Sequence, residues 1–237
     1  MVKSEYPIYW EKNGFSIKIF CSIPAIATGI LLKAGESKIV IDPGDGILRD
    51  LNDELEPEEI LSVTDVFVTH GHHDHVGGVW SLLTYLRVMR KRTPLYIWYP
   101  EGCSEIESIY NAFRTVYSNS ISYPIILRPI MDYKRFVRRG VAINPFPVKH
   151  SETTGNGDET RFVPALGYKF TWNGTKICYG GDTAWCPELA RNAKGSDLAI
   201  LEAGEDEDSV PGMHMTMEEA DKIGRSAKEF FLVHVPQ

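Results

Sequence analysis

The chain has 237 residues, 43% of them hydrophobic, and its formal net charge is −7. This length and hydrophobic content suit one globular domain with a sizeable core, whereas the acidic balance argues against a general nucleic-acid binder, which carries a basic surplus. The four cysteines form no Cys-x-x-Cys pair, which argues against a disulfide framework and against a zinc–thiolate site.

The start of the chain and its apolar runs bear on localisation. Residues 1–10 contain charges and a proline but no apolar segment of the kind found in a signal peptide. No apolar run approaches the roughly 20 residues that a membrane-spanning helix needs. We therefore expect a cytoplasmic protein with no membrane partner, and we leave open whether it forms a homodimer.

The first half of the chain alternates strand-like and helix-like segments. Short apolar or β-branched runs bounded by Gly, Pro or Asp predict strands. Residues at helical spacing from Val79 through Leu86 to Met89 or Arg90 predict a helix that Pro94 ends. Residues 42–46, Asp-Pro-Gly-Asp-Gly, predict a turn. The predicted strands are residues 16–21, 28–33, 38–41, 66–68 and 95–99, and a second helix is predicted over residues 104–117.

The second half of the chain has the same character. Asn173-Gly174 is a strong hairpin signal between two strands, and Thr216 with Glu219 predicts a capping box at the start of a helix over residues 217–230. Candidate ligands repeatedly follow strands, so we predict a single domain over residues 1–237 whose sheets hold a site at their strand ends. The predicted strands are residues 141–148, 165–172, 176–179, 198–201 and 231–233.

Four of the seven histidines lie within six residues, in the segment His70-Gly-His-His-Asp-His75. Imidazole nitrogens and carboxylate oxygens bind zinc at about 2.0–2.2 Å. Alternation along the backbone can aim His70 and His72 at one ion, while the adjacent Asp74 and His75 point toward a second. A histidine-rich surface loop is the alternative. The buried strand before this loop and the further ligand candidates downstream argue against that alternative.

The segment Thr69-His-Gly-His-His-Asp-His-Val-Gly-Gly78 resembles the H-x-H-x-D-H signature of the metallo-β-lactamase superfamily. The resemblance extends over nearly the whole chain, through Ile39-Val-Ile-Asp-Pro-Gly44, His150, Gly181-Asp182-Thr183 and His234. It implies an α+β fold, the four-layer αββα sandwich in which two sheets face each other with helices outside.

The resemblance also implies two divalent metal ions, which we expect to be zinc, with manganese as the alternative. Asp42 resembles a residue that orients a ligand histidine, although a plain Asp-Pro turn would explain it equally well. His73 is a spacer to which we assign no role. The implied ligands are His70, His72 and His150 for one ion, Asp74, His75 and His234 for the other, and Asp182 as the bridge, with Asp74 also counted as catalytic.

Two segments resemble the ribonuclease Z and phosphodiesterase branch of this superfamily. His214-Met-Thr216 is similar to its H-x-T segment, which implies that His214 is a general acid. Leu201-Glu-Ala-Gly204 is similar to its His-Glu-Ala-Thr segment, which implies that Glu202 orients His214. Leu and Gly replace the first and last residues of that segment, and this departure weakens Glu202 more than His214. The long tRNA-binding arm of ribonuclease Z is absent, because residues 151–181 have room only for a glycine-rich loop and a hairpin.

We therefore expect a dinuclear metal-dependent hydrolase, a phosphodiesterase whose ions share the attacking hydroxide and whose substrate is a small anionic phosphodiester. A ribonuclease Z-type tRNA 3′ endonuclease, with RNA as partner, is one alternative. Hydrolysis of a lactone, thioester or β-lactam is another, and the intact ligand set argues against a binding protein without catalysis. Basic residues that would contact the substrate or form a solvated surface are Arg87, Arg90, Lys91, Arg92, Lys134, Arg135, Arg138 and Arg139.

Overall fold

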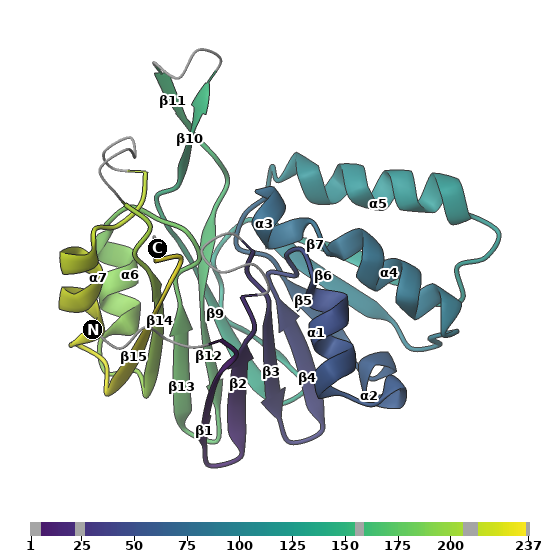
Figure 1. The fold of residues 1–237 in the computed structure, drawn as a ribbon, viewed down its shortest axis with the longest axis horizontal. Helices are drawn as coiled ribbons and strands as arrows, with labels where there is room; N and C mark the ends of the chain where they lie inside the picture. Colours follow the sequence, from purple (N-terminus) through teal and green to yellow (C-terminus); the bar gives the residue numbers. More distant parts are fainter. Residues whose placement is uncertain (1–5, 22–26, 155–158, 206–212, 236–237) are drawn as a thin grey trace. The chain divides into compact units, whose positions relative to one another are not determined.

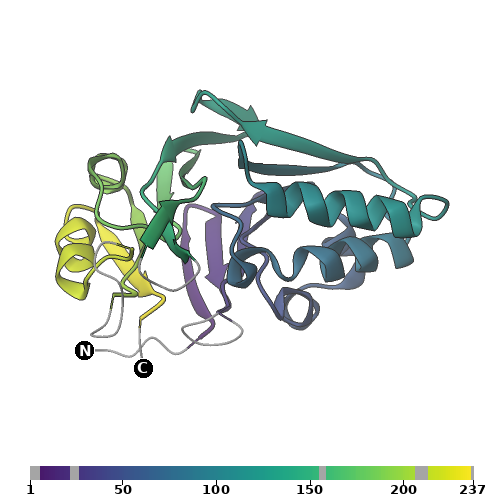
Figure 2. The same ribbon diagram turned by 90° about the horizontal axis from the view of Figure 1, so that it is seen from above.

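The computed structural model describes residues 6–21, 27–154, 159–205 and 213–235 (Figures 1 and 2). Two segments on which the sequence analysis based expectations lie partly outside the described residues. They are the start of the chain, at residues 1–5, and the expected glycine-rich loop, at residues 155–158. The chain forms two compact units, Met1–Ile130 and Met131–Gln237, and their grouping into one domain stays a prediction. Within the described ranges, every helix is too short or too polar to cross a lipid bilayer.

The first unit is built on a seven-stranded sheet in the order β1-β2-β3-β4-β5-β6-β7. Strands β1 to β4 pair antiparallel, whereas β4 to β7 run parallel because helices return the chain between successive strands. The histidine-rich segment therefore leaves the carboxyl end of a parallel strand, β5. The strands are β1 (Ile8–Lys12), β2 (Phe15–Ile19), β3 (Ile30–Ala34), β4 (Ser37–Ile41), β5 (Asp65–Phe67), β6 (Leu95–Pro100) and β7 (Ile125–Ile130).

Helices cover one face of this sheet. Leu51 of α1, Leu86 of α4 and Phe113 of α5 pack into one core with Val66 of β5 and Ile97 of β6. Figure 1 shows α1, α4 and α5 on the same side of the strands. Amphipathic spacing explains the arrangement, because the apolar residues of α4 recur every three or four positions and point into this core. The helices are α1 (Ile47–Glu54), α2 (Pro57–Leu61), α3 (His73–Val76), α4 (Val79–Val88) and α5 (Ser104–Tyr117).

The second unit has a six-stranded sheet in the order β15-β14-β13-β12-β9-β8. Strands β8, β9, β12 and β13 pair antiparallel with their neighbours in that order, whereas β13, β14 and β15 run parallel. Leu189 of α6 and Ile223 of α7 share a core with Leu201 of β14. The elements are β8 (Phe136–Arg138), β9 (Val141–Pro147), β12 (Leu166–Trp172), β13 (Thr175–Tyr179), α6 (Pro187–Ala193), β14 (Leu198–Glu202), α7 (Met217–Gly224) and β15 (Glu229–Val233).

A separate antiparallel ribbon follows β9, formed by β10 (Ser151–Thr154) and β11 (Glu159–Phe162). Figure 1 shows this ribbon projecting from the sheet of its own unit. The sequence analysis expected only a loop here. The strands escaped prediction because their residues are mostly polar and exposed, so that no alternation of apolar and polar side chains marks them.

Most predicted elements are confirmed, with bounds that differ by a few residues in all but one case. The helix predicted over residues 104–117 is α5, residue for residue. At the predicted hairpin, Asn173 and Gly174 both have positive φ, 46° and 80°, as a type I′ turn requires. The capping box is also present, since the Glu219 N–H donates to Thr216 Oγ1 (3.2 Å) and the Thr216 N–H donates to Glu219 Oε2 (3.1 Å).

The helix predicted over residues 217–230 is shorter than expected, because α7 ends at Gly224. The N–H groups of Lys228 and Glu229 instead donate to the carbonyls of Ser196 (3.0 Å) and Asp197 (3.2 Å), which starts the pairing of β15 with β14. The Phe230 ring packs directly on Gly224, where a side chain would not fit. Apolar spacing alone could not distinguish this turn of helix from a buried parallel strand.

Buried and exposed positions of α4 give a test of the core of the first unit. Leu86 is fully buried, whereas Val88 is 59% exposed. We expect Leu86→Ala to lower the free energy of unfolding by about 2–5 kcal/mol, because the surrounding core cannot fill the cavity. Val88→Ala should change it by less than about 0.5 kcal/mol. Denaturant unfolding followed by tryptophan fluorescence measures both, and equal losses would contradict this packing.

Candidate functional site

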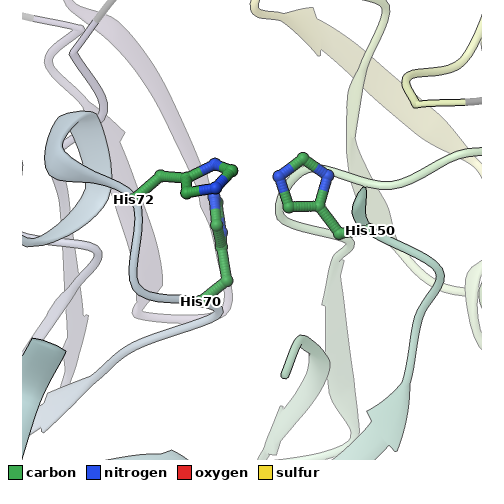
Figure 3. A group of neighbouring side chains, drawn as sticks. All are labelled: His70, His72 and His150. Atoms are coloured by element: carbon green, nitrogen blue, oxygen red, sulfur yellow. The ribbon is translucent and has the colours of Figure 1, made fainter. Parts of the chain in front are cut away.

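The first group of candidate ligands lies in the loop after β5, in the first unit. His70 and His75 are fully buried, and His72 is half-buried. The ring centroids of His70 and His72 are 4.7 Å apart, and those of His70 and His75 are 4.2 Å apart. Figure 3 shows the rings of His70 and His72 side by side. Imidazoles gathered in this way offer nitrogen donors for a divalent cation.

Asp42, just after β4, organises this loop. Its carboxylate is fully buried. Oδ1 accepts a hydrogen bond from the Thr69 N–H (2.7 Å), and Oδ2 accepts bonds from Thr69 Oγ1 (2.7 Å) and from Nδ1 of His75 (2.9 Å). The last contact places the imidazole proton of His75 on Nδ1, which makes Nε2 the electron-pair donor of that ring. The geometry therefore supports the interpretation of Asp42 as an orienting residue over that of a plain turn.

Asp74 and His75 are arranged as two ligands of one cation would be. Nε2 of His75 lies 3.3 Å from Oδ2 of Asp74. Two atoms bound at about 2.0–2.2 Å to one tetrahedral ion lie roughly 3.3–3.6 Å apart. The Asp74 carbonyl also accepts a hydrogen bond from the Thr28 N–H (2.9 Å), which fixes the backbone of the pair.

His73, which the sequence analysis treated as a spacer, has a partner. Its Nε2 lies 2.7 Å from Oδ2 of Asp45, and both side chains are exposed. The Gly78 N–H donates to the carbonyl of Pro43 (2.8 Å). This hydrogen bond is a second contact, besides that of His73 with Asp45, between the turn after β4 and the histidine loop. Sequence alone shows Asp45 three residues after Asp42, but no local pattern links it to a residue 28 positions later.

His150 follows β9 in the second unit and is almost fully buried (Figure 3). The preceding residue, Lys149, joins this segment to the turn after β13. Its carbonyl accepts a hydrogen bond from the Ala184 N–H (2.7 Å), and its N–H donates to Oγ1 of Thr183 (3.0 Å). The Gly-Asp-Thr motif thus fixes the backbone beside His150 through its threonine, a role that the sequence analysis did not assign.

Asp182 and His234 come together within the second unit because β13, β14 and β15 are parallel. Their carboxyl ends lie at one edge of the sheet, and the candidate residues follow or end these strands. Asp182 is 4% exposed, and its Oδ2 lies 3.7 Å from Nε2 of His234. This arrangement suits one cation bound by both residues, since a carboxylate oxygen and an imidazole nitrogen are both common metal ligands.

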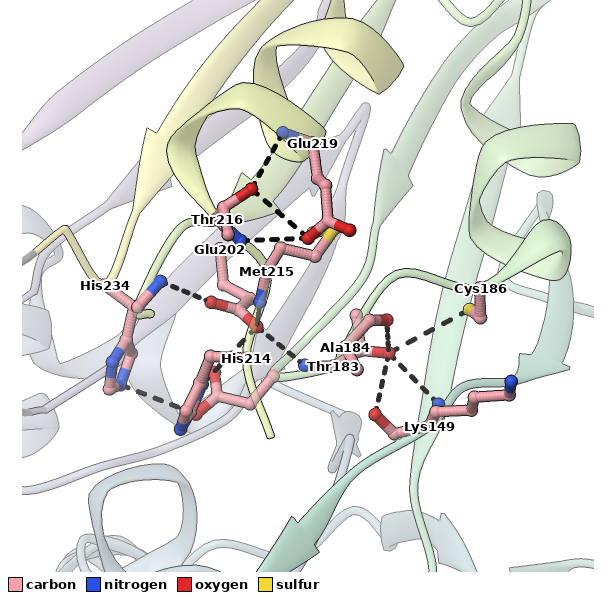
Figure 4. A network of polar contacts seen from close by, with 12 residues as sticks. Lys149, Thr183, Ala184, Cys186, Glu202, His214, Met215, Thr216, Glu219 and His234 are labelled. Carbon is pink, nitrogen blue, oxygen red and sulfur yellow. Dashed lines mark hydrogen bonds and ion pairs between the residues drawn. The ribbon is translucent and has the colours of Figure 1, made fainter. Parts of the chain in front are cut away.

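Glu202, the last residue of β14, holds His214 (Figure 4). Its fully buried Oε1 lies 3.4 Å from Nδ1 of His214 and accepts hydrogen bonds from the N–H groups of Thr183 (3.0 Å) and Met215 (3.0 Å). The centroid of the His214 ring is 5.5 Å from that of His150 and 6.1 Å from that of His234. The residues of the H-x-T segment and of the Leu-Glu-Ala-Gly segment are therefore neighbours.

The surroundings of Glu202 combine burial with several donors. Burial raises the pKa of its carboxyl above the ordinary value, and the hydrogen bond with His214 acts in the opposite direction. Oε2 accepts a further bond from the Gly204 N–H (2.6 Å). A Cβ at position 204 would lie 3.1 Å from Nδ1 of His214 and 3.2 Å from Oε2 of Glu202. The glycine that departs from the family's segment therefore fits tightly beside the pair.

Two of the basic residues singled out in the sequence have structural contacts. The guanidinium of Arg87 lies 4.1 Å from the centroid of the Tyr117 ring. Lys91 is buried, and its Nζ donates to the Leu61 carbonyl and to Oγ1 of Thr93 (2.8 Å). These contacts account for the presence of the two basic residues without requiring that either one binds a substrate.

Comparisons with known proteins bear on the family. A family model described as "Beta-lactamase superfamily domain" matches residues 37–235. Ribonuclease Z of Pyrococcus horikoshii is 26% identical over 263 aligned residues, which cover 90% of this chain and 79% of that protein.

Solved structures give the fold. The short form of human tRNase Z superposes with a TM-score of 0.70 at 20% identity, covering 89% of this chain and 86% of that one. YhfI from Bacillus subtilis, described as a metallo-beta-lactamase fold protein, has a TM-score of 0.69 at 20% identity, covering 90% and 79%. These likenesses confirm the α+β fold class expected from the sequence.

The contacts of Asp42 generate a test of the histidine loop. Asp42→Asn removes the negative charge that orients His75, so we expect the affinity for zinc or manganese to fall about 10- to 100-fold. Competition with a chromophoric chelator measures this affinity. Asp45→Asn is the matched control, because it makes the same chemical change in an exposed pair and should have little effect. If both variants lost affinity equally, the special role of Asp42 would be excluded.

Proposed function

The chain belongs to the beta-lactamase superfamily, and from this premise we propose that it is a metal-dependent hydrolase of small phosphodiesters. The observation that carries the proposal is the pairing of His214 with the buried carboxylate of Glu202. An imidazole held by a carboxylate beside other imidazoles is suited to proton transfer at a metal-dependent site.

We propose that seven side chains hold two divalent ions. The donor set fits such ions, because it consists only of imidazole nitrogens and carboxylate oxygens, and because Asp42 fixes the ring of His75 in advance. When bound, the ions would lower the pKa of a water molecule and neutralise charge on the phosphoryl group. The proposed ligands are His70, His72, Asp74, His75, His150 and His234, with Asp182 shared between the ions.

His214 is proposed to donate a proton from Nε2 to the departing oxygen. Its Nδ1 faces Glu202, so that this carboxylate fixes the ring and leaves Nε2 as the proton donor. An alkoxide such as a ribose oxygen leaves badly without a proton, so a positioned acid supports phosphodiester cleavage. Asp74 is proposed as a ligand that also accepts a hydrogen bond from the attacking water.

Cleavage of tRNA at its 3′ side is the second candidate. It is favoured by the relative from Pyrococcus horikoshii, which is named ribonuclease Z. The formal net charge of −7 and the 31-residue interval between His150 and Asp182 favour a smaller substrate. A precursor tRNA therefore belongs in the substrate panel, beside a dinucleotide, a cyclic nucleotide, a lactone, a thioester and a β-lactam.

Metal stoichiometry tests the proposed ligands. We expect about two ions per chain after loading with zinc or manganese, measured by elemental analysis. Asp182→Ala should remove more than one ion, because a shared carboxylate serves both sites. Asp221→Ala, an exposed aspartate of α7 that pairs with Arg225, is the control and should retain both ions. Fewer than one ion in the unaltered chain would contradict the proposal.

The leaving group tests His214. A positioned general acid contributes about 10²–10⁴-fold to the rate, so His214→Ala should lose that much on a diester with a ribose or alkyl leaving group. On a nitrophenyl ester the loss should be far smaller, because nitrophenolate leaves without a proton. Glu202→Gln should show the same selectivity in milder form. Values of kcat/KM on both substrates measure the difference.

Metal content of the same preparations separates the alternatives. An acid leaves the number of bound ions unchanged, whereas a ligand loses metal and activity on both substrates together. A histidine without a role changes neither. Equal losses on both leaving groups would overturn the assignment of His214 as the general acid.

A further inference from the structure

The ribbon of β10 and β11 begins one residue after His150. Its register pairs Ser151 with Phe162, and the Val163 N–H donates to the His150 carbonyl (3.1 Å), which extends the same pairing by one residue. Side chains two positions apart in a strand share a face. Glu152 therefore lies on the ribbon face that carries His150, roughly 6–7 Å further along the strand.

Arg161 is paired with Glu152 across the ribbon, on this same face. Its Nε and Nη2 both contact Oε1 of Glu152, so the carboxylate holds one edge of the guanidinium. The arginine side chain nevertheless remains 69% exposed. A guanidinium fixed at one edge and open to solvent is prepared to bind a phosphate with its remaining donors.

We propose that Arg161 binds a second phosphate of the substrate, beside the diester that is cleaved. The proposal rests on the proposed function, because it takes His150 as a ligand at the reaction centre. It names the substrate class more closely: a nucleotide-like diester that carries another phosphate close to the scissile one. Arg161 is the only cationic residue among residues 151–163, so the ribbon has one position for such a group.

Glu159 sets a limit on the length of the substrate. It lies two residues from Arg161 in β11, hence on the same face, and it pairs with Thr154 farther from His150. A carboxylate there repels a third phosphate. The ribbon face therefore favours a short substrate with two phosphates over a long polyanion.

Two nitrophenyl esters test this inference on the metal-loaded chain. One is thymidine 5′-(p-nitrophenyl phosphate), and the other is the same ester with an added 3′-phosphate. We expect the unaltered chain to have a KM about ten-fold lower for the second ester, as for one charged hydrogen-bonded contact. Arg161→Gln should abolish this preference and leave kcat unchanged on the first ester. Raising the salt concentration should weaken the preference.

Arg191→Gln is the matched control. Arg191 pairs with Glu188 on α6, so the variant removes the same charge from an exposed ion pair outside the ribbon, and it should keep the preference. Glu152→Gln should retain the preference, because the arginine remains and a carboxylate that repels the phosphate is removed. A preference that is absent in the unaltered chain, or that survives Arg161→Gln, overturns the inference.

Equilibrium binding separates this inference from the proposed function. Calorimetry compares thymidine 3′,5′-bisphosphate with thymidine 5′-monophosphate, neither of which must be cleaved. Tighter binding of the bisphosphate that Arg161→Gln removes supports the role of Arg161, even if both esters resist hydrolysis and the proposed function fails. Hydrolysis of both esters without any preference leaves the proposed function standing and refutes the role of Arg161.

Discussion

The buried carboxylate of Asp42 is the constraint on which the ligand loop of the first unit depends. It receives hydrogen bonds from the beginning of the loop, at Thr69, and from its end, at His75. An anion without water is tolerated only when its lone pairs are occupied, and each of these donors would itself be costly to bury alone. The loop and the aspartate therefore require each other, and the intervening histidines have little freedom.

In the second unit, a different buried carboxylate fixes the loops that carry candidate site residues. Glu202 closes β14 and accepts backbone hydrogen bonds from Thr183 and Met215, which come from two different loops. Each loop carries a candidate functional residue next to the bonded N–H group, Asp182 in one and His214 in the other. In both units, then, a carboxylate at the end of a strand fixes loops that bear the chemistry, so that rigid elements set the positions of the side chains.

Much of the fold could be predicted because periodicity and turn chemistry are local. The bounds of α5 and the hairpin at Asn173-Gly174 follow from neighbouring residues alone. The end of α7 could not be predicted, since Phe230 satisfies a helical pattern as well as a strand, and only its pairing with β14 decides. Candidate site residues were identified by motif, whereas Asp45 and the backbone contacts of Thr183 depend on partners far along the chain. Distance in sequence, more than residue type, separates what could be predicted from what could not.

The pairing of β15 with its neighbouring strand determines whether His234 reaches the candidate site. Among the described residues this strand pairs with β14 alone, at the edge of its sheet, and His234 follows it directly. Edge strands open at a lower free energy than central ones, so molecules in which β15 has detached also lose the approach of His234 to Asp182. A ligand that needs both residues binds only the paired form, and by linkage it must stabilise that form. Amide exchange in β15 would then slow as the ligand concentration rises.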